Sequence, residues 1–267
     1  MAILAISREY GSGGRDIGRL VARQLGYEFV DKGRLFQDLD KAGARWARVS
    51  RELDEVCPTL WERHDWQYRG YVALMESLIF DYAAQDKVVI IGRGGFFLLR
   101  EVPFCLRVRL VAPVDVRLER LLVRESLDRE AAEQLMSRVD NDRACYLKAN
   151  YGIDWLAEEL YDLVLNSGQL TYEQVAELLV QGLADKERLA SPEAKARLLD
   201  EALARRLKAR LATNAGLLLP TLEVSLQAGA LLVSATIHTP KEQHLIQDIT
   251  REVCGGRTVR FDLHHRV

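Results

Sequence analysis

Glycines and arginines gather in one short segment near the start of the chain, residues 6–18, with the sequence ISREYGSGGRDIG. Gly11, Gly13 and Gly14 let the backbone turn tightly and come close to a ligand. Successive amides and the start of the following helix would then face one concavity, which favours an anion such as phosphate. Arg15 adds a permanent charge and a planar set of donors suited to phosphate oxygens. The position of the segment after the first predicted strand, together with Arg8 and Arg15, predicts a phosphate site, with a tight turn that holds no ligand as the alternative.

The segment is close to the Walker A pattern G-x-x-x-x-G-K-[ST] but departs from it at the positions that carry its chemistry. Arg8 stands where the first glycine is usual, Gly14 stands at the lysine, and no serine or threonine follows. The lysine normally reaches the β- and γ-phosphates of a nucleotide, and the hydroxyl normally binds Mg²⁺. We predict that Arg15 supplies the missing charge and that Asp16 binds the metal. If no metal is bound, Asp16 would instead repel phosphate.

Two further candidates come directly after predicted strands. Arg93 comes just after the apolar run 88–91, and Asp31 follows the short run 27–30. Ligands of open α/β sheets bind at the carboxyl ends of the strands, so we predict that Arg93 contacts a substrate phosphate. Asp31 would orient acceptor hydroxyls or assist the metal; the alternative is that it caps the helix that follows.

Arginines also follow one face of a predicted helix. Arg117, Arg120 and Arg124 are three and four positions apart, so they share one side of helix 116–124. In a phosphotransferase such a stripe closes over a triphosphate and neutralises its charge. The alternative is a solvated helix face paired with neighbouring carboxylates. Arg120 and Arg124 are therefore candidate nucleotide contacts.

The elements that would position these residues alternate between strands and helices over the first two thirds of the chain. Short apolar runs predict strands, and apolar positions three or four apart predict helices. This order is typical of an α/β fold, a parallel sheet with helices on both faces. The predicted strands are 2–7, 27–30, 88–91, 106–111 and 161–165. The predicted helices are 16–25, 116–124 and 172–182, and 38–86 is expected to be mostly helical.

A polar stretch with a proline, 185–193, predicts a linker between a domain at 1–184 and a smaller one at 194–267. The smaller domain has the order αββαβ, which is typical of a compact α+β unit. Its predicted elements are helix 194–211, strands 222–227 and 230–237 joined by Ala228-Gly229, helix 240–253 and strand 258–263.

The composition is that of a soluble globular protein, since 48% of the 267 residues are hydrophobic and 28% are charged. A net charge of −2 excludes a protein-wide basic footprint for nucleic acid. No apolar run approaches the length of a membrane span, and we expect no secretory signal. Cys57, Cys105, Cys145 and Cys254 lie far apart, which argues against a zinc site or a disulfide framework. We expect a cytoplasmic protein without a membrane span or a nucleic-acid partner.

Five blocks of this sequence, taken together and in order, resemble the cytidylate kinase-like family. They are ISREYGSGGRDIGRLVARQLGYEFVDKG, VVIIGRGG, VRLVAPVDVRLERL, DNDRACYLKANYGIDW and YDLVLNSGQLTYEQVAELL. The resemblance covers about 1–184. It implies a P-loop nucleoside monophosphate kinase fold and transfer of the γ-phosphoryl group of ATP, with Mg²⁺, to a nucleotide.

The resemblance also implies roles for single residues. Those expected to bind ATP are Gly11, Ser12, Gly13, Gly14, Arg15, Asp16, Arg120 and Arg124, and those expected to bind the acceptor are Asp31, Lys32, Arg93, Arg138 and Asp142. Arg15, Arg93 and Arg138 would act on the transferred phosphoryl group, and Asp16 would hold Mg²⁺. The sequence departs from the family pattern at Gly14, Lys32, Gln37 and Cys145. Fewer of the residues that would recognise cytidylate are therefore present. The expected acceptor is therefore a nucleoside monophosphate or a related small molecule, with CMP a poor candidate.

The C-terminal unit resembles a BON domain in its αββαβ order, in the segment LLVSATIHTPKEQHLIQDI and in the ending GGRTVRFDL. This resemblance implies a regulatory or interaction domain, through which the chain would form a homo-oligomer or bind a protein partner. Two alternatives to the kinase stay open. One is a non-catalytic protein that senses a nucleotide or phosphate through a degenerate P-loop, and the other is a structural protein with an empty loop.

Overall fold

The computed structural model describes residues 2–41, 43, 45–46, 48–49, 53, 55–227 and 229–265. The chain forms two compact units, and each unit takes segments from several parts of the sequence. Unit 1 consists of Met1–Asp38, Leu53–Pro58 and Gln85–Ala194. Unit 2 consists of Leu39–Glu52, Thr59–Ala84 and Lys195–Val267.

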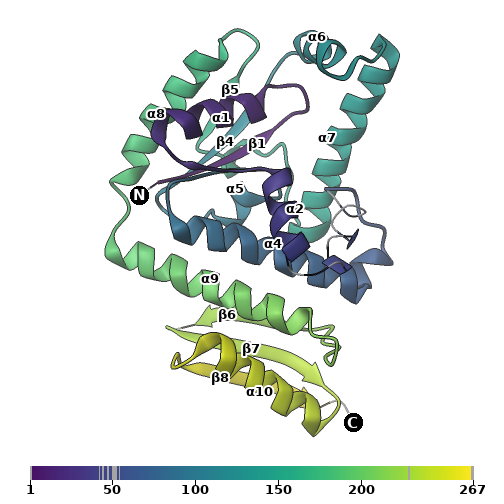
Figure 1. Cartoon of the computed structure of the whole chain (residues 1–267), viewed down its shortest axis with the longest axis vertical. Coiled ribbons are helices and arrows are strands. Elements are labelled where there is room, and N and C mark those ends of the chain that lie inside the picture. Colours follow the sequence, from purple (N-terminus) through teal and green to yellow (C-terminus); the bar gives the residue numbers. More distant parts are fainter. Residues whose placement is uncertain are drawn as a thin grey trace. The chain divides into compact units, whose positions relative to one another are not determined.

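Unit 1 is built on a five-stranded sheet with the strand order β2-β3-β1-β4-β5 (Figure 1). All neighbouring strands in it are parallel. The strands are β1 (Ile3–Arg8), β2 (Glu28–Val30), β3 (Val88–Ile91), β4 (Cys105–Val111) and β5 (Leu163–Asn166). The five predicted strands are thereby confirmed. Because β1 is the central strand, the glycine loop that follows it lies in the middle of the carboxyl edge of the sheet.

Apolar side chains on both faces bury this sheet between helices. On one face, Ile6 of β1 packs in a core with Ile17 of α1 (Gly14–Leu25) and Leu179 of α8 (Tyr172–Glu187). On the other face, the side chain of Ile90 lies directly beside Gly95 of α5 (Gly95–Leu98). The predicted α/β class, with helices on both faces, is confirmed.

Two further long helices of unit 1 stand beside the carboxyl edge of the sheet: α6 (Val114–Glu125) and α7 (Arg129–Tyr151). Asp128 caps α7 by accepting a hydrogen bond from the amide of Ala131, and Gly152 ends the helix in a left-handed conformation. Apolar periodicity does not predict α7, because few of its residues are buried and charged side chains cover most of its length. The described residues of 38–86 are mostly helical, as predicted. The segment between β2 and β3 contains α2 (Lys32–Lys41) and α4 (Trp66–Gln85), and between them the described residues 45–46 and 48–49 are helical and Glu62–His64 forms a short 3₁₀ turn.

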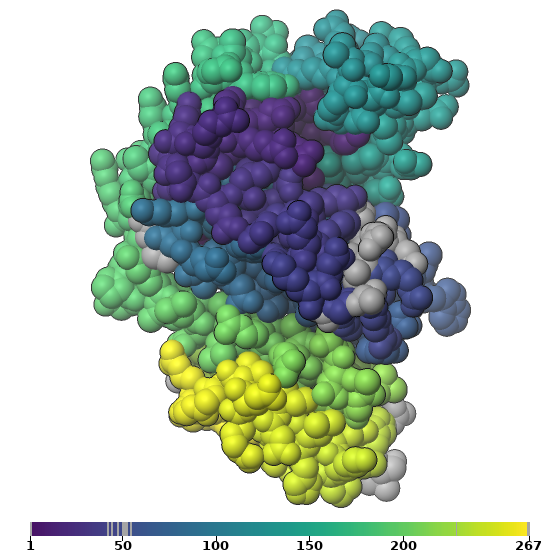
Figure 2. All heavy atoms as spheres, in the orientation of Figure 1, coloured from purple at the N-terminus to yellow at the C-terminus, as the bar shows by residue number. Residues whose placement is uncertain are grey.

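Unit 2 contains a small sheet with the order β6-β7-β8, in which β6 and β7 are antiparallel and β7 and β8 are parallel. Its elements are α4, most of α9 (Pro192–Ala212), β6 (Glu223–Gln227), β7 (Ala230–Ile237), α10 (Pro240–Cys254) and β8 (Val259–His265). Leu207 of α9, Val233 of β7 and Ile246 of α10 lie in one core. The predicted αββαβ order is confirmed, and the C-terminal elements form one continuous yellow area in the space-filling view (Figure 2).

The predicted linker at 185–193 is a short break between two helices, since α8 ends at Glu187 and α9 begins at Pro192. The boundary between domains at 1–184 and 194–267 stays a prediction, because unit 2 also includes α4. Of the predicted turn at 228–229, Ala228 lies outside the described residues, and Gly229 has a left-handed φ of 77°. Among the described helices, none combines the length and the apolar character that crossing a bilayer requires.

Cys57 and Cys145 are joined by a disulfide, with their Cα atoms 5.0 Å apart. The expectation that the cysteines would not pair was wrong for these two. They are 88 positions apart in the sequence, so only the tertiary fold brings them together. Cys105 and Cys254 are free and buried.

Candidate functional site

The loop between β1 and α1 borders a hollow of about 560 Å³ at the carboxyl edge of the parallel sheet. The amides of Gly11, Gly13, Gly14 and Arg15 donate no hydrogen bond to any described residue. Amides of this kind at the start of a helix carry partial positive charge and bind anions. The hollow is lined by Arg8, Glu9, Tyr10, Gly11, Gly13, Gly14, Arg15, Asp16, Arg19, Asp31, Lys32, Gly33, Phe36, Ile91, Arg124, Glu125 and Arg143.

A second hollow of about 450 Å³ shares Gly11, Gly13, Asp16 and Arg124 with the first. The remaining lining residues are Glu119, Arg120, Val123 and Tyr172. Because the same loop borders both spaces, an elongated ligand that lies across the loop can occupy both of them. The two hollows are called the larger and the smaller hollow below.

Two glycines of the loop have no room for a side chain. Gly13 has a φ of +79°, and a Cβ built on it would lie 2.5 Å from the ring of Tyr172. A Cβ on Gly14 would lie 2.8 Å from the Cβ of Arg8. Tyr172 therefore covers the loop from α8, and the stem of Arg8 fills the space in which a lysine at position 14 would begin.

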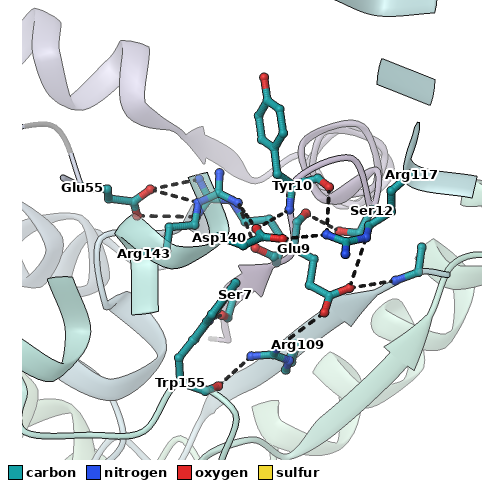
Figure 3. A network of polar contacts seen from close by, with 12 residues as sticks. Ser7, Glu9, Tyr10, Ser12, Glu55, Arg109, Arg117, Asp140, Arg143 and Trp155 are labelled. Carbon is teal, nitrogen blue, oxygen red and sulfur yellow. Dashed lines mark hydrogen bonds and ion pairs between the residues drawn. The ribbon is translucent and has the colours of Figure 1, made fainter. Parts of the chain in front are cut away.

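Arg117 of α6 and Asp140 of α7 hold the loop in its shape (Figure 3). The amide of Tyr10 donates to Oδ1 of Asp140 at 2.8 Å, and Arg117 donates to Oδ2 at 2.6 Å. Arg117 also donates to the carbonyl of Tyr10 at 3.3 Å and lies 3.6 Å from the carboxylate of Glu9. Only 8% of Arg117 is exposed, so these polar contacts act largely out of water, where they are stronger.

A second set of contacts fixes the end of β1 beneath the loop (Figure 3). The indole of Trp155 donates to the hydroxyl of Ser7 at 2.7 Å. Buried Arg109 donates to the carbonyl of Trp155 at 2.6 Å and lies 3.6 Å from Glu9. These contacts anchor the strand end from which the loop starts.

Three guanidinium groups converge on the carboxylate of Glu55, and we call Arg8, Arg93 and Arg143 the arginine cluster. Their nearest nitrogens lie 3.5, 3.4 and 3.4 Å from its oxygens, respectively. The amide of Arg93 donates to Oε1 of Glu55 at 2.7 Å. Arg8 and Arg143 also line the larger hollow, whereas Arg93 is 2% exposed and does not line it.

The arginine cluster keeps Glu55 ionised. Burial alone raises the pKa of this carboxyl, but the charges of Arg8, Arg93 and Arg143 together hold the pKa well below its usual range. Burial, together with the charge of Arg8, lowers the pKa of Arg143 to about 10. Arg143 is therefore still protonated at neutral pH, and the cluster keeps a surplus of positive charge.

Arg15 and Asp31, both predicted site residues, bind each other. Nε of Arg15 donates to Oδ2 of Asp31 at 2.9 Å, while Oδ1 accepts the amide of Arg34 at 3.1 Å. Burial raises the pKa of Asp31, and the hydrogen bond from Arg15 contributes most to the net lowering. Asp31 thus caps α2 and lines the larger hollow, so the two alternatives from the sequence coexist. Lys32 lies 5.2 Å from the ring centre of Phe36, and both line the same hollow.

The predicted arginine stripe on α6 reaches the loop. Arg120 donates to the carbonyl of Ser167 at 2.8 Å, lies 5.1 Å from the ring centre of Tyr172 and lines the smaller hollow. Arg124 lies 5.0 Å from the ring centre of Tyr10 and lines both hollows.

Arg138 and Asp142 lie apart from the other predicted site residues. They line a shallow depression on α7 that shares no residue with the larger or the smaller hollow. Their neighbours Asp140 and Arg143, on another side of the same helix, contact the loop and the arginine cluster instead. All four lie on α7, a helix that the sequence analysis did not predict, so the sequence did not tell which of them would face the loop.

The residues around the loop fit a nucleotide polyphosphate with a divalent cation. The free amides provide donors for phosphate oxygens, and Asp16 borders both hollows. No described residue makes a hydrogen bond or ion pair with the Asp16 carboxylate. Mg²⁺ is commonly held by one or two carboxylates together with phosphate oxygens and water. No group of three or more His, Cys, Asp or Glu side chains that could hold a metal ion occurs in the described part of the chain.

Comparisons with known proteins agree with this geometry. Residues 3–169 match the sequence model of the cytidylate kinase-like family. The cytidylate kinase of Sulfolobus acidocaldarius is 30% identical over 190 residues, which cover 70% of this chain and 97% of that protein. The uronate isomerase of Corynebacterium glutamicum is 35% identical over 104 residues, 39% of this chain but only 20% of that protein.

A solved structure of an uncharacterized protein from Eubacterium ventriosum aligns with 69% of this chain and 99% of its own, with a TM-score of 0.54 and 19% identity. At this identity, the likeness shows the fold alone.

A parallel sheet whose central strand runs into a glycine loop of free amides defines a kinase-like, nucleotide-binding fold. This chain belongs to the cytidylate kinase-like family. The family match ends at residue 169, so the sheet of β6, β7 and β8 lies outside it.

Sequence reasoning missed part of the site. Glu55 and Asp140 were not among the predicted site residues, and Arg8 was counted towards phosphate binding without being placed among them. The position of Arg8 in the sequence could have indicated its role, since it stands at the first position of the Walker A pattern, directly before the loop. No sequence pattern indicated Glu55, because its contacts with the arginine cluster depend on the backbone conformation at Glu55 itself, where φ is 42°.

Proposed function

We propose that this protein transfers the γ-phosphoryl group of ATP to a small phosphorylated acceptor, a nucleoside monophosphate or a related molecule. One observation carries the proposal: two hollows meet at a loop of free amides and share Gly11, Gly13, Asp16 and Arg124. A kinase needs a donor and an acceptor whose phosphates meet at one point. The shared loop offers such a point.

The donor would lie across the loop, with its nucleoside in the smaller hollow beside Arg120 and Tyr172. The amides of Gly13 and Gly14 would bind phosphate oxygens, and Asp16 would hold Mg²⁺. When bound, Mg²⁺ would neutralise charge on the β- and γ-phosphates.

Arg8 is the best placed substitute for the missing lysine, because its stem packs against Gly14 and it lines the larger hollow. Arg15, which the sequence favours for this role, is 60% exposed and bound to Asp31. We therefore propose that Arg8 stabilises the transferred group and that Arg15 has a lesser part.

The acceptor would occupy the larger hollow, with its phosphate near Arg8 and Arg143. Asp31, Lys32 and Phe36 line the same space and would contact the rest of the molecule. Arg93 would act through Glu55 and Arg8, because it does not line the hollow. Arg138 and Asp142 would act only on an acceptor that reached their side of α7. Catalysis would consist mainly of positioning and charge stabilisation, since phosphoryl transfer needs little covalent help.

A second candidate is a non-catalytic protein that senses nucleotides or phosphate. The ion pairs of Glu55 with Arg8 and Arg143 favour it, because they offset charge that a transition state would need. In this case the loop binds phosphate without accelerating its transfer.

For unit 2 we propose an accessory role in binding a protein partner or a second copy of the chain. The support is its separate core and its αββαβ order, which resembles a BON domain. The nucleotide substrates proposed for unit 1 favour the cytoplasm as the place of action.

Thermal unfolding with ATP, ADP and a panel of nucleoside monophosphates, with and without Mg²⁺, tests the binding step. A ligand at 100 times its Kd should stabilise the protein by ~2.7 kcal/mol. Phosphate transfer from ATP to the same monophosphates then tests the reaction. Arg188→Ala is a matched control, since Arg188 is 80% exposed and pairs with Asp185. Binding with transfer supports the kinase and binding without transfer supports the sensor, whereas an absence of any shift contradicts both.

A further inference from the structure

The disulfide lies next to the contact between Glu55 and Arg143. Cys57 comes two residues after Glu55, and Cys145 comes two residues after Arg143 on α7. The bridge therefore ties the segment that carries Glu55 to the helix that carries one of its guanidinium partners. Both cysteines are only half-buried, so small thiols and disulfides can reach them.

Glu55 competes with any anion in the larger hollow. Arg8 and Arg143 face the hollow and also contact the Glu55 carboxylate, so the charge that they offer to a ligand is partly taken up. The three guanidinium contacts, at 3.4–3.5 Å, are longer than the 2.7–2.9 Å or so usual for a charged hydrogen bond. The amide of Arg93 holds one carboxylate oxygen at 2.7 Å, whereas the guanidinium groups contact the carboxylate only loosely and have room to close around a tetrahedral anion.

The backbone at Glu55 shows that its surroundings hold it in place. Its φ of 42° lies in the left-handed region, which side-chain-bearing residues adopt only when the surrounding structure imposes it. Among the described residues, the disulfide is the one covalent constraint on this segment apart from the chain itself. Its removal would let the backbone relax and withdraw the carboxylate.

We propose that Cys57 and Cys145 form a reversible thiol–disulfide site, and that its disulfide form weakens phosphate binding in the larger hollow by holding Glu55 on the arginine cluster. This inference rests on the proposed function, because it concerns the same anion site. The bridge acts by raising the effective concentration of the Glu55 carboxylate at Arg8 and Arg143.

The chemistry is thiol–disulfide exchange. A small disulfide such as glutathione disulfide is attacked by one protein thiolate, which gives a mixed disulfide and releases one thiol. The second protein thiolate attacks the protein sulfur of that mixed disulfide, forms the Cys57–Cys145 bond and releases the second thiol. The two protein sulfurs lose two electrons and two protons in total, and the small disulfide gains them. A dithiol reverses both steps.

The test compares phosphate affinity in the two redox forms of the full chain. One sample is oxidised with glutathione disulfide and the other is reduced with dithiothreitol, and both are exchanged into the same buffer under nitrogen. Non-reducing peptide mapping checks the Cys57–Cys145 linkage. The apparent Kd for inorganic phosphate is taken from thermal unfolding at increasing phosphate, with sodium chloride holding the ionic strength constant. The expected result is binding tighter by roughly tenfold or more in the reduced protein.

Two variants separate this inference from the proposed function. Glu55→Gln removes the competing charge and should bind phosphate tightly in both redox forms. Cys57→Ser/Cys145→Ser should behave as the reduced protein whatever the treatment. The inference would be overturned if the two redox forms of the unmodified protein bound phosphate equally well, or if oxidation left four free thiols. The proposed function would still stand in that case if Glu55→Gln bound phosphate tightly. A lack of phosphate binding in every form, Glu55→Gln included, would overturn both.

Discussion

The stem of Arg8 occupies the space in which a side chain at Gly14 would begin. A Cβ built on Gly14 would lie 2.8 Å from Cβ of Arg8 and 3.0 Å from its Cγ. The Walker A lysine position and Arg8 therefore exclude each other sterically. The cation nearest to this position is therefore Arg8, which lines the larger hollow from the end of β1.

Replacing Arg8 should weaken nucleotide binding more than replacing Arg15. Loss of a charged hydrogen bond costs about 1.5–3 kcal/mol, so Arg8→Ala should raise the Kd for ATP by roughly 10- to 150-fold. Arg15→Ala should have a smaller effect, because Arg15 is largely exposed and engaged with Asp31. Calorimetric titration of both variants with ATP, beside Arg188→Ala, measures this. A larger effect of Arg15→Ala would show that Arg15, and not Arg8, supplies the charge of the missing lysine.

Restoring the lysine should require the removal of Arg8. Gly14→Lys alone forces the stem of Arg8 to move and should lower both stability and ATP affinity. Arg8→Gly/Gly14→Lys should recover much of both losses, because the new cation then has room. The four proteins form a double-mutant cycle whose coupling is measured by thermal unfolding and ATP titration. Additive effects of the two changes would show that the side chains do not compete for space.

Because Tyr172 covers the loop at Gly13, we expect substitution of Gly13 to lower the stability of the protein more than substitution of other left-handed glycines. Gly13→Ala should destabilise the protein through its φ of +79° and through the contact with Tyr172. Gly152→Ala is the matched control, since Gly152 has a φ of +71° but nothing within 4 Å of an added Cβ. We expect Gly13→Ala to lose ~1–3 kcal/mol more in urea unfolding, as overpacking does. Equal losses would mean that the ring of Tyr172 moves aside freely.

The side of α7 that faces the loop should determine which arginine matters for the acceptor. Arg143→Ala should raise KM for the acceptor by about tenfold or more, because Arg143 lines the larger hollow. Arg138→Ala should leave KM nearly unchanged, since Arg138 lines the separate depression on α7. Steady-state kinetics on the two variants decides between them, and a dominant effect at Arg138 would contradict the placement of the acceptor.

The ion pairs of Glu55 should stabilise the protein at neutral pH and fade in acid. The folded pKa of Glu55 lies well below its usual range, so its contribution is fully present above about pH 4.3, the usual pKa of a glutamate. It is lost as the pH falls towards the folded pKa. The difference in unfolding free energy between the unmodified protein and Glu55→Gln should therefore shrink steadily below about pH 4. A difference that stays constant or grows in acid would show that Glu55 is not held ionised by the cluster.

The sequence predicts the parts of this molecule that local patterns encode. The strands of the parallel sheet, the αββαβ order and the phosphate-loop position follow from apolar runs, glycines and turn residues. Helix α7 was missed because its buried positions are too few to show a period. The disulfide was missed because its cysteines meet only through the tertiary fold.

For the site, the sequence predicted the loop but not the contacts that single side chains make through the tertiary fold. The sequence brings Gly13, Asp16 and Arg124 to the loop, and the structure places them there. It could not distinguish Arg143 from Arg138, since α7 was not predicted and the five positions between them turn the two side chains about 140° apart around the helix. Nor could it show that Arg15 and Asp31 bind each other, because this contact depends on how α1 and β2 end beside the hollow.

The central claim is that free amides of the loop, together with Arg8, hold a polyphosphate without the usual lysine. A crystal structure of the protein with Mg²⁺ and a non-hydrolysable ATP analogue tests it most directly. We predict phosphate oxygens within hydrogen-bond distance of the amides of Gly13 and Gly14, with the guanidinium of Arg8 turned towards them. An analogue bound elsewhere, or phosphates held by Arg15 while Arg8 stays on Glu55, would contradict it.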